Sequence, residues 1–103
     1  MAMTLMVQRH VIPGVQGDIK RLLRELRANA TRQPGFVSGR TVVDAKSPTI
    51  FMTISVWANM GVWEAWEKNP ERQEIIDRIN ELVQGKPTER IWLDDEDTPD
   101  GGV

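Results

Sequence analysis

The sequence has no cysteine, no tyrosine and only one histidine among its 103 residues. Without cysteine the chain cannot form disulfides, thiolate metal sites or a cysteine nucleophile. One histidine leaves few options for a nucleophile–base pair or a metal cluster, and no glycine-rich phosphate loop or HExxH motif is present. We therefore predict no metal site, and any chemistry must come largely from the substrate or from a bound cofactor.

Long hydrophobic runs are absent as well. No apolar stretch approaches the roughly 20 residues that a membrane-spanning helix needs. The N-terminus also lacks the charged start and the cleavage site of a signal peptide. We therefore predict a cytoplasmic protein that does not bind membranes, and a chain of this length has room for one domain with one modest core.

The charge is unevenly distributed, although the net charge is only −2. Five of the 15 acidic residues lie in residues 94–103, so residues 1–93 contain 13 basic and 10 acidic residues. An acidic segment with so few apolar residues cannot bury enough surface to fold. We therefore predict one domain over residues 1–93 and a disordered acidic tail over residues 94–103.

The first third of the chain predicts a strand and then an amphipathic helix. Thr4 to Ile12 has apolar residues on both faces, and Pro13-Gly14 ends this strand. The helix carries one continuous apolar stripe, made of Val15, Ile19, Leu22, Leu23, Leu26 and Ala30. We interpret its basic face as solvated rather than nucleic-acid-binding, because no aromatic residues are interleaved with Lys20, Arg21, Arg24 and Arg27.

The middle of the chain predicts an antiparallel hairpin. Gln33-Pro34-Gly35 is a strong break, and Phe36 to Asp44 is β-branched or alternates in polarity. The loop of residues 45–48 turns the chain into a second β-rich run, Thr49 to Trp57. Two strands joined by about four loop residues make a hairpin.

Two helices and a last strand complete the predicted order. Asn59 is a candidate N-cap for a short helix that holds Trp63 and Trp66. Asn69-Pro70-Glu71 begins a third helix, which we expect Gly85 to end, and its apolar face comprises Ile75, Ile76, Ile79, Leu82 and Val83. Thr88 to Leu93 is the last strand. The order β-α-β-β-α-α-β predicts an α+β ferredoxin-like sandwich, with helices on one face of an antiparallel sheet.

The strands are apolar on both faces, although the helices can cover only one. The strand of residues 49–57 carries Ile50, Met52, Ile54 and Val56 on one side, and Phe51, Thr53, Ser55 and Trp57 on the other. A wetted sheet face would alternate cleanly between apolar and polar residues, and a bare apolar face is too large a patch for a soluble monomer. We therefore predict a homodimer through the open sheet face.

One family shares this arrangement. Four features in this order resemble the antibiotic biosynthesis monooxygenase family. They are the PGF turn, a hairpin ending in Val56-Trp57, a helix with Trp63 and Trp66, and the Asn-Pro-Glu sequence that begins the next helix. The resemblance extends over nearly the whole body, about Leu5 to Leu93. It implies a dimeric α+β barrel, in which the sheets of two copies close into a shared barrel. The family includes both cofactor-free oxygenases and haem-degrading enzymes.

The resemblance implies a cofactor-independent monooxygenase of a small aromatic or quinol-type substrate, with no cofactor. Such substrates pass an electron to O₂ themselves once deprotonated, so the protein supplies an apolar pocket, a proton acceptor and hydrogen-bond donors. Trp66 matches the tryptophan that lines the family's cavity, and we predict that it is catalytic. His10 is the second predicted catalytic residue, because histidine is the side-chain type best suited to proton transfer near neutral pH and this is the only one in the sequence. A hydrogen-bonded structural histidine is the alternative.

Four further residues are candidates for substrate binding. Trp63 lies one turn before Trp66, and Trp57 ends the strand before that helix. Arg9 and Arg40 lie on predicted strands and could bind an acidic group of the substrate. The alternative for the tryptophans is a role in the core, and for the arginines a salt bridge.

Two other functions remain open. The haem-degrading branch uses an asparagine in its first strand, a tryptophan, and a histidine about ten residues later that ligates iron. Trp66 matches this pattern, but the asparagine position falls on Val7 and the histidine position on Ile76, and neither can ligate iron. The other alternative is a non-catalytic dimer that binds a small apolar or aromatic molecule.

Overall fold

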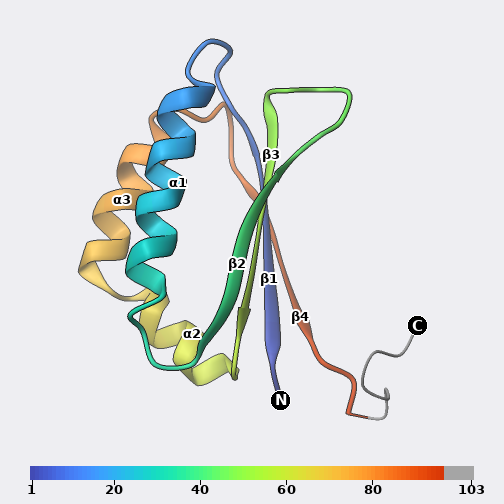
Figure 1. Ribbon diagram of the computed structural model, residues 1–103, viewed down its shortest axis with the longest axis vertical. Helices are drawn as coiled ribbons and strands as arrows, with labels where there is room; N and C mark the ends of the chain where they lie inside the picture. The colour runs from blue at the N-terminus through green and yellow to red at the C-terminus, as the bar shows by residue number, and fades with distance from the viewer. Residues whose placement is uncertain (97–103) are drawn as a thin grey trace.

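A computed structural model describes residues 1–96 of the protein. A four-stranded antiparallel sheet is covered on one face by helices, so the predicted α+β ferredoxin-like class is confirmed (Figure 1). The elements follow the predicted order: β1 (Met3–His10), α1 (Gln16–Ala30), β2 (Phe36–Val43), β3 (Ile50–Trp57), α2 (Met60–Glu67), α3 (Pro70–Asn80) and β4 (Thr88–Leu93).

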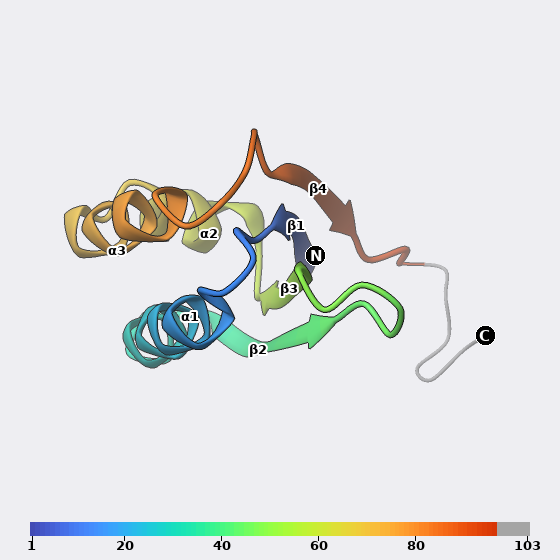
Figure 2. The same cartoon turned by 90° about the horizontal axis from the view of Figure 1, so that it is seen from above.

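The strands are arranged in the order β2-β3-β1-β4, and every neighbouring pair is antiparallel. Seen from above, α1 and α3 lie together on one side of the sheet, and no other described segment covers the opposite side (Figure 2). The sheet therefore has a helix-facing side and an open side, as the two-sided apolar strands predicted.

The strand register determines which residues share each side. In β1 the odd positions from Met3 to Arg9 are buried, whereas the even positions from Thr4 to Gln8 are half-buried and His10 is exposed. Val7 pairs with Thr53 under the helices, and Met6 pairs with Ile54 on the open side. The open side thus carries Met6, Val42, Met52, Ile54, Val56 and Trp92.

The turn before β2 requires glycine at its last position. Gly35 has φ +82°, a left-handed conformation that other residues adopt only with strain. A Cβ atom at Gly35 would also lie only 2.6 Å from Cγ2 of Val62 in α2. The Gly35 carbonyl accepts a hydrogen bond from Ala58 N at 2.8 Å, so this turn holds β2 against the start of α2.

The two predicted helix caps are confirmed. The Asn59 side chain accepts a hydrogen bond from Val62 N at 3.0 Å. Asn69 Oδ1 accepts from Glu71 N at 2.8 Å and from Arg72 N at 3.3 Å, and Pro70 occupies the first turn. These bonds satisfy N–H groups that have no partner inside the helix.

Replacing Asn69 with alanine is expected to lower the free energy of unfolding by about 1 kcal/mol, the usual cost of a lost N-cap. Asn69→Asp keeps the acceptor oxygen and is expected to retain most of the stability. Urea denaturation of both variants measures the difference. Equal stability of the alanine variant and the wild type would contradict the capping role.

The third helix ends earlier than predicted. It stops at Asn80, and Glu81 is its C-cap, so the prediction that Gly85 ends the helix is wrong. Gly85 does adopt a positive φ of +72°, but in the connection to β4. Leu82 and Val83 lie outside the helix and still pack against its core cluster, because Val83 pairs with Val11 in a short β-bridge. The regular spacing of Leu82 and Val83 after the helix therefore reflects burial against the same core, and the helix does not continue through them.

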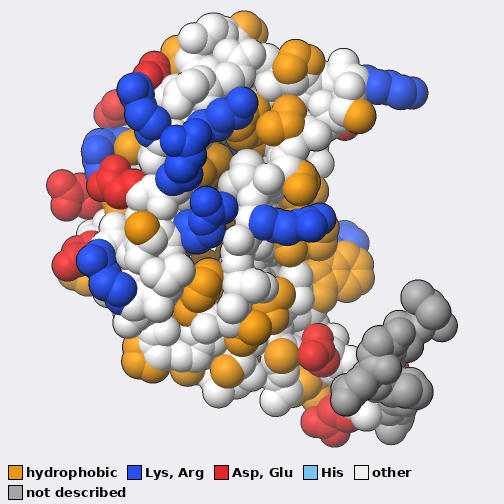
Figure 3. Space-filling view, viewed as in Figure 1, with side chains coloured by type: hydrophobic (Ala, Val, Ile, Leu, Met, Phe, Trp, Pro, Cys, Tyr) orange, Lys and Arg blue, Asp and Glu red, His pale blue; other side chains and the backbone are white. Residues whose placement is uncertain are grey.

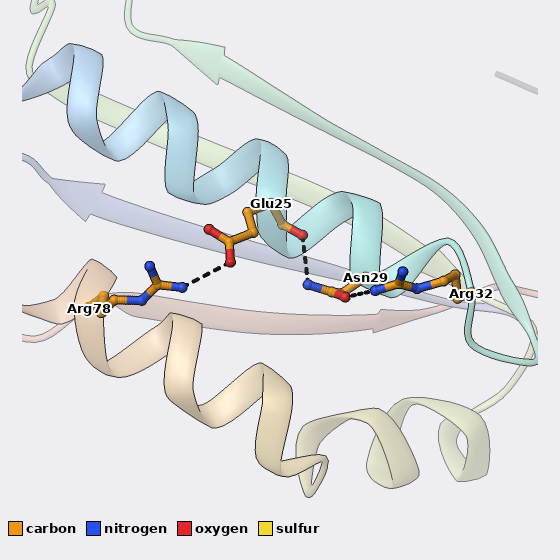
Figure 4. A network of polar contacts seen from close by, with 4 residues as sticks. All are labelled: Glu25, Asn29, Arg32 and Arg78. Carbon is orange, nitrogen blue, oxygen red and sulfur yellow. Dashed lines mark hydrogen bonds and ion pairs between the residues drawn. The ribbon is translucent and has the colours of Figure 1, made fainter.

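The two long helices are joined at the surface by polar contacts. Arg78 Nη2 of α3 donates a hydrogen bond to Glu25 Oε1 of α1 at 2.9 Å, and Asn29 Nδ2 donates to the Glu25 carbonyl at 3.1 Å (Figure 4). Arg32 in turn donates to the Asn29 side chain. These groups are partly exposed, so they fix the orientation of the helices more than they stabilise the fold.

The predicted basic face of α1 is exposed. Lys20, Arg21, Arg24 and Arg27 are all exposed. Figure 3 shows Lys and Arg side chains gathered over the helical side of this face. Within residues 1–96, no helix has the length and apolar character needed to span a bilayer.

The acidic tail predicted over residues 94–103 begins directly after β4. Asp94 N donates a hydrogen bond to the Ala2 carbonyl at 2.9 Å, so residue 94 still contacts the domain. Most of the tail predicted as disordered, residues 97–103, lies outside the described residues.

The core consists of two clusters of buried side chains under the helices. One surrounds the three tryptophans between the sheet and α2, and it comprises Met3, Leu5, Val7, Ala30, Trp57, Trp63 and Trp66. The other lies between α1, α3 and the far end of the sheet, and it comprises Val11, Ile19, Leu23, Phe51, Ile75 and Ile79. The candidate site lies where these clusters meet.

Candidate functional site

Three tryptophans from two elements form an aromatic cluster. Trp57 ends β3, and Trp63 and Trp66 lie one turn apart on α2, so all three point into the space between sheet and helices. The ring centroid of Trp57 lies 5.7 Å from that of Trp63 and 6.3 Å from that of Trp66, with Trp66 stacked at 27°. Phe36 contacts the edge of Trp57 at 5.2 Å. The aromatic residues predicted from sequence are therefore brought together.

A cavity of about 70 Å³ opens beside this cluster. Its walls include all three tryptophans, the aliphatic side chains of α1 and the helix-facing side of β1. Polar side chains also line it, and these belong to Arg9, Arg27, Arg40, Thr41, Thr53, Ser55 and Arg72. Of the four arginines, Arg27 and Arg40 are exposed. A concave, mostly apolar space with a few convergent polar groups is the usual form of a small-molecule site.

The indole N–H groups of the three tryptophans differ in their partners. Trp57 Nε1 donates to Ser55 Oγ at 3.2 Å, so this N–H is already used. Trp63 and Trp66 make no hydrogen bond through Nε1 within the described part of the chain. Buried indole N–H groups normally find a partner. Trp66 and Trp63 can thus donate to a ligand, whereas Trp57 serves mainly as a wall.

Arg9 is the buried charged residue of the site. It lies on the helix-facing side of β1 and is only 5 % exposed. Its Nη1 donates to Thr53 Oγ1 at 3.3 Å, and its Nε is buried with no partner. Burial lowers the pKa of Arg9 from its ordinary 12.5 to about 10, with an opposing effect from Glu89 and a further lowering by Arg72. Arg9 remains protonated at neutral pH, and no carboxylate of the described residues forms an ion pair with it.

Arg72 brings a second cation to the same cavity. Its guanidinium carbon lies 5.1 Å from the ring centroid of Trp63, a cation–π distance. Burial lowers the pKa of Arg72, and the carboxylates of Glu67 and Glu89 oppose that shift. Arg72 was not among the site residues predicted from sequence, although its spacing from Ile75, Ile76 and Ile79 places it on the buried face of α3.

The other residues predicted for the site lie elsewhere. His10 is exposed on the open side of the sheet, because it follows the inward-pointing Arg9 in an alternating strand. The structure therefore does not bring His10 together with Trp66 in this cavity. Arg40 borders the cavity on the edge strand β2, but its pairing with Ile54 puts its exposed side chain on the open face.

The residues present do not fit a haem group. Val7 and Ile76 both line the cavity at the two positions where the haem-degrading pattern needs an asparagine and an iron ligand. Neither side chain can ligate iron, and His10 lies on the other side of the sheet. Among residues 1–96, no three His, Asp or Glu side chains lie close enough together to hold a metal ion.

Solved structures of known proteins share this fold. The cofactor-independent oxygenase SnoaB from Streptomyces nogalater superposes with a TM-score of 0.81 at 16% identity, covering 96% of this chain and 99% of that one. A conserved protein from Methanosarcina mazei superposes with a TM-score of 0.85 at 15% identity, covering 89% of this chain and 91% of that one. At such identities the likeness shows the fold alone. No curated protein matches this chain in sequence.

The family comparison reaches further than these structures. The family model described as antibiotic biosynthesis monooxygenase matches residues 2–78, which contain the cavity-lining strands, α1, α2 and most of α3. This match covers well over half of the chain, and it includes the tryptophan cluster, Arg9 and Arg72. The chain therefore belongs to the antibiotic biosynthesis monooxygenase family.

Proposed function

We propose that the protein is a cofactor-independent monooxygenase of a small aromatic or quinol-type substrate. The observation that carries the proposal is the tryptophan-walled cavity, in which the indole N–H of Trp66 has no partner within the described chain. Family membership and the resemblance to the SnoaB fold support it. The apolar walls would hold an electron-rich ring, and Trp66 would donate a hydrogen bond to a substrate oxygen.

The chemistry balances without an added reductant. For an anthrone-type substrate, a CH₂ group and O₂ become a carbonyl group and water, and the carbon supplies all four electrons. The protein binds and orients the ring, excludes bulk water and stabilises the charge that develops on the substrate oxygen. We do not assign the proton transfer to His10, because that side chain lies on the opposite side of the sheet.

Oxygen uptake tests this proposal. The purified, metal-stripped protein is mixed with anthrones, dihydronaphthoquinones and catechols, and each rate is compared with the substrate's own autoxidation. Protein-dependent uptake without added flavin, metal or haem is the expected result. Uptake at background across the panel would favour the non-catalytic small-molecule-binding dimer instead.

Replacing Trp66 with phenylalanine is expected to lower turnover by about tenfold or more, because the ring is kept and a donor to the reacting oxygen is lost. Stability should fall little, since the phenyl ring fills most of the space. Oxygen uptake per folded molecule and thermal unfolding are measured on the same sample.

Trp92→Phe is the matched control, because Trp92 lies on β4 away from the cavity and is 49 % exposed. It is expected to keep full activity. If Trp66→Phe lowered thermal stability with activity per folded molecule unchanged, Trp66 would have a core role only.

We further propose that the protein forms a homodimer through the open side of the sheet. The side chains of Met6, Met52, Ile54 and Val56 form a half-buried apolar strip there, and Val42 and Trp92 extend it at 36 % and 49 % exposure. No described segment of the chain covers this strip. An apolar surface of this kind is typical of an interface with another copy.

A further inference from the structure

The geometry points to an anion subsite in the cavity, in which Arg9 and Arg72 bind the carboxylate of a single-ring aromatic acid. This inference deepens the proposed function, since it specifies an acidic aromatic substrate, and it rests on that function only for the reaction. The subsite itself rests on the placement of two guanidinium groups in one tryptophan-walled cavity.

The free edge of Arg9 is the first observation. A guanidinium group has five N–H donors and no acceptor, and two of its edges can bind both oxygens of a carboxylate at once. Arg9 uses Nη1 for Thr53, whereas Nε is buried without a partner and Nη2 makes no hydrogen bond within residues 1–96. Arg9 lines the cavity, and the donors of its Nε–Nη2 edge have no partner among the described residues. A buried donor without a partner costs stability, so it is retained where something pairs with it.

The charge balance around Arg9 is the second observation. No carboxylate of the described residues forms an ion pair with Arg9 or with Arg72. Burial disfavours the charged form of both arginines, and Arg72 adds to that effect at Arg9. Glu89 opposes it at both residues and Glu67 at Arg72, but neither carboxylate forms an ion pair with them. Two cations that repel each other across a low-dielectric cavity would both be stabilised by one anion between them.

The remaining walls limit what that anion can be attached to. Trp57, Trp63 and Trp66 offer ring faces, and the α1 side chains Leu23 and Leu26 offer aliphatic contacts. Inorganic phosphate or sulfate would leave these apolar walls without a partner. The cavity is small, at about 70 Å³, so a single ring that carries the acid is the simplest ligand to test. A benzoate-type acid matches both the charge and the walls.

The test compares benzoate with its neutral counterpart benzamide by NMR on the ¹⁵N-labelled full chain at fixed chloride. The four indole N–H signals and the Nε–H signal of Arg9 report the site directly, and Trp92 is an internal control outside the cavity. Benzoate is expected to bind at least about tenfold more tightly than benzamide, as a charge-assisted bidentate pair should. It should shift Arg9 Nε–H together with the Trp63 and Trp66 signals, and leave Trp92 unchanged.

Variants separate binding at the subsite from a general attraction of benzoate to exposed arginines. Arg9→Gln and Arg72→Gln are each expected to reduce the benzoate preference to less than about threefold. Arg24→Gln removes an exposed arginine of α1 that does not line the cavity, and it should keep the full preference. Arg72 is only half-buried, whereas Arg9 is buried, so Arg72→Gln remains informative if the Arg9 variant does not fold.

Equal binding of benzoate and benzamide by the wild type would overturn the inference. So would a benzoate preference that survives in both cavity variants. The readout does not depend on turnover. Benzoate binding with oxygen uptake at background would refute the proposed reaction and support the subsite. Uptake of neutral quinols without a benzoate preference would refute the subsite and support the reaction.

Discussion

Replacing Trp57 with alanine is expected to lower the free energy of unfolding by about 3–5 kcal/mol, the usual range for a large aromatic residue in a core. The side chain is 1 % exposed and lies at the centre of the aromatic cluster, in contact with Phe36, Trp63 and Trp66. Its removal leaves three rings without a partner and joins the void to the existing cavity. Since small domains are stable by only about 5–15 kcal/mol, much of the protein could unfold at 37 °C.

Urea denaturation at a fixed protein concentration measures this loss, since the stability of a dimer depends on concentration. Trp57→Phe is the matched control and should lose less than half as much, because it keeps a ring against Phe36. A loss below about 1 kcal/mol for Trp57→Ala would mean that the cluster contributes little to the core.

Replacing Met52 with aspartate is expected to convert the proposed dimer to monomer. Met52 lies on the open side of β3 between Gln8 and Val42, is half-buried in the single chain and does not line the cavity. A carboxylate buried in an apolar interface would cost at least about 3 kcal/mol, roughly a hundredfold in Kd. In the separated chain the same carboxylate remains hydrated, so the fold should survive.

Sedimentation velocity measures the change in mass, and circular dichroism checks the fold. Met52→Leu keeps the apolar surface and is expected to remain dimeric. Ala65→Asp adds the same charge on the exposed face of α2 and should also remain dimeric. A wild-type protein that sediments as a monomer, or an aspartate variant that stays dimeric, would contradict an interface on the open side.

The parts of the fold that depend on local chemistry could be predicted from sequence. Asn59 and Asn69 are caps because their side chains bond backbone N–H groups two or three residues later. The hairpin followed from its turn residues, and Asp44 closes it by accepting hydrogen bonds from Lys46 N and Ser47 N. The end of α3 could not be predicted, because Leu82 and Val83 continue the apolar spacing while reaching the core from a loop.

The site was harder to predict than the fold. A strand that is apolar on both sides does not indicate which alternate residues face the helices. Sequence could therefore not decide whether Arg9, a substrate-binding candidate, or His10, a catalytic candidate, lies on that side. The register decides between them, and it places Arg9 under the helices. The position of Arg72 near the cavity could have been predicted from its spacing, since it shares a helix face with Ile75 and Ile76. Arginine on an apolar stripe is easily taken for a helix-edge residue whose aliphatic stem packs on the core.

Isotope incorporation is the measurement that tests the central claim most directly, because a monooxygenase transfers one atom of O₂ to its product. The metal-stripped protein is given the best substrate of the uptake panel under ¹⁸O₂, and the product mass is read before exchange with water. The account predicts a product that carries one ¹⁸O atom, formed faster with the wild type than with Trp66→Phe or without protein. Product without ¹⁸O, or labelled product formed at the same rate without protein, would contradict an oxygenase in this cavity.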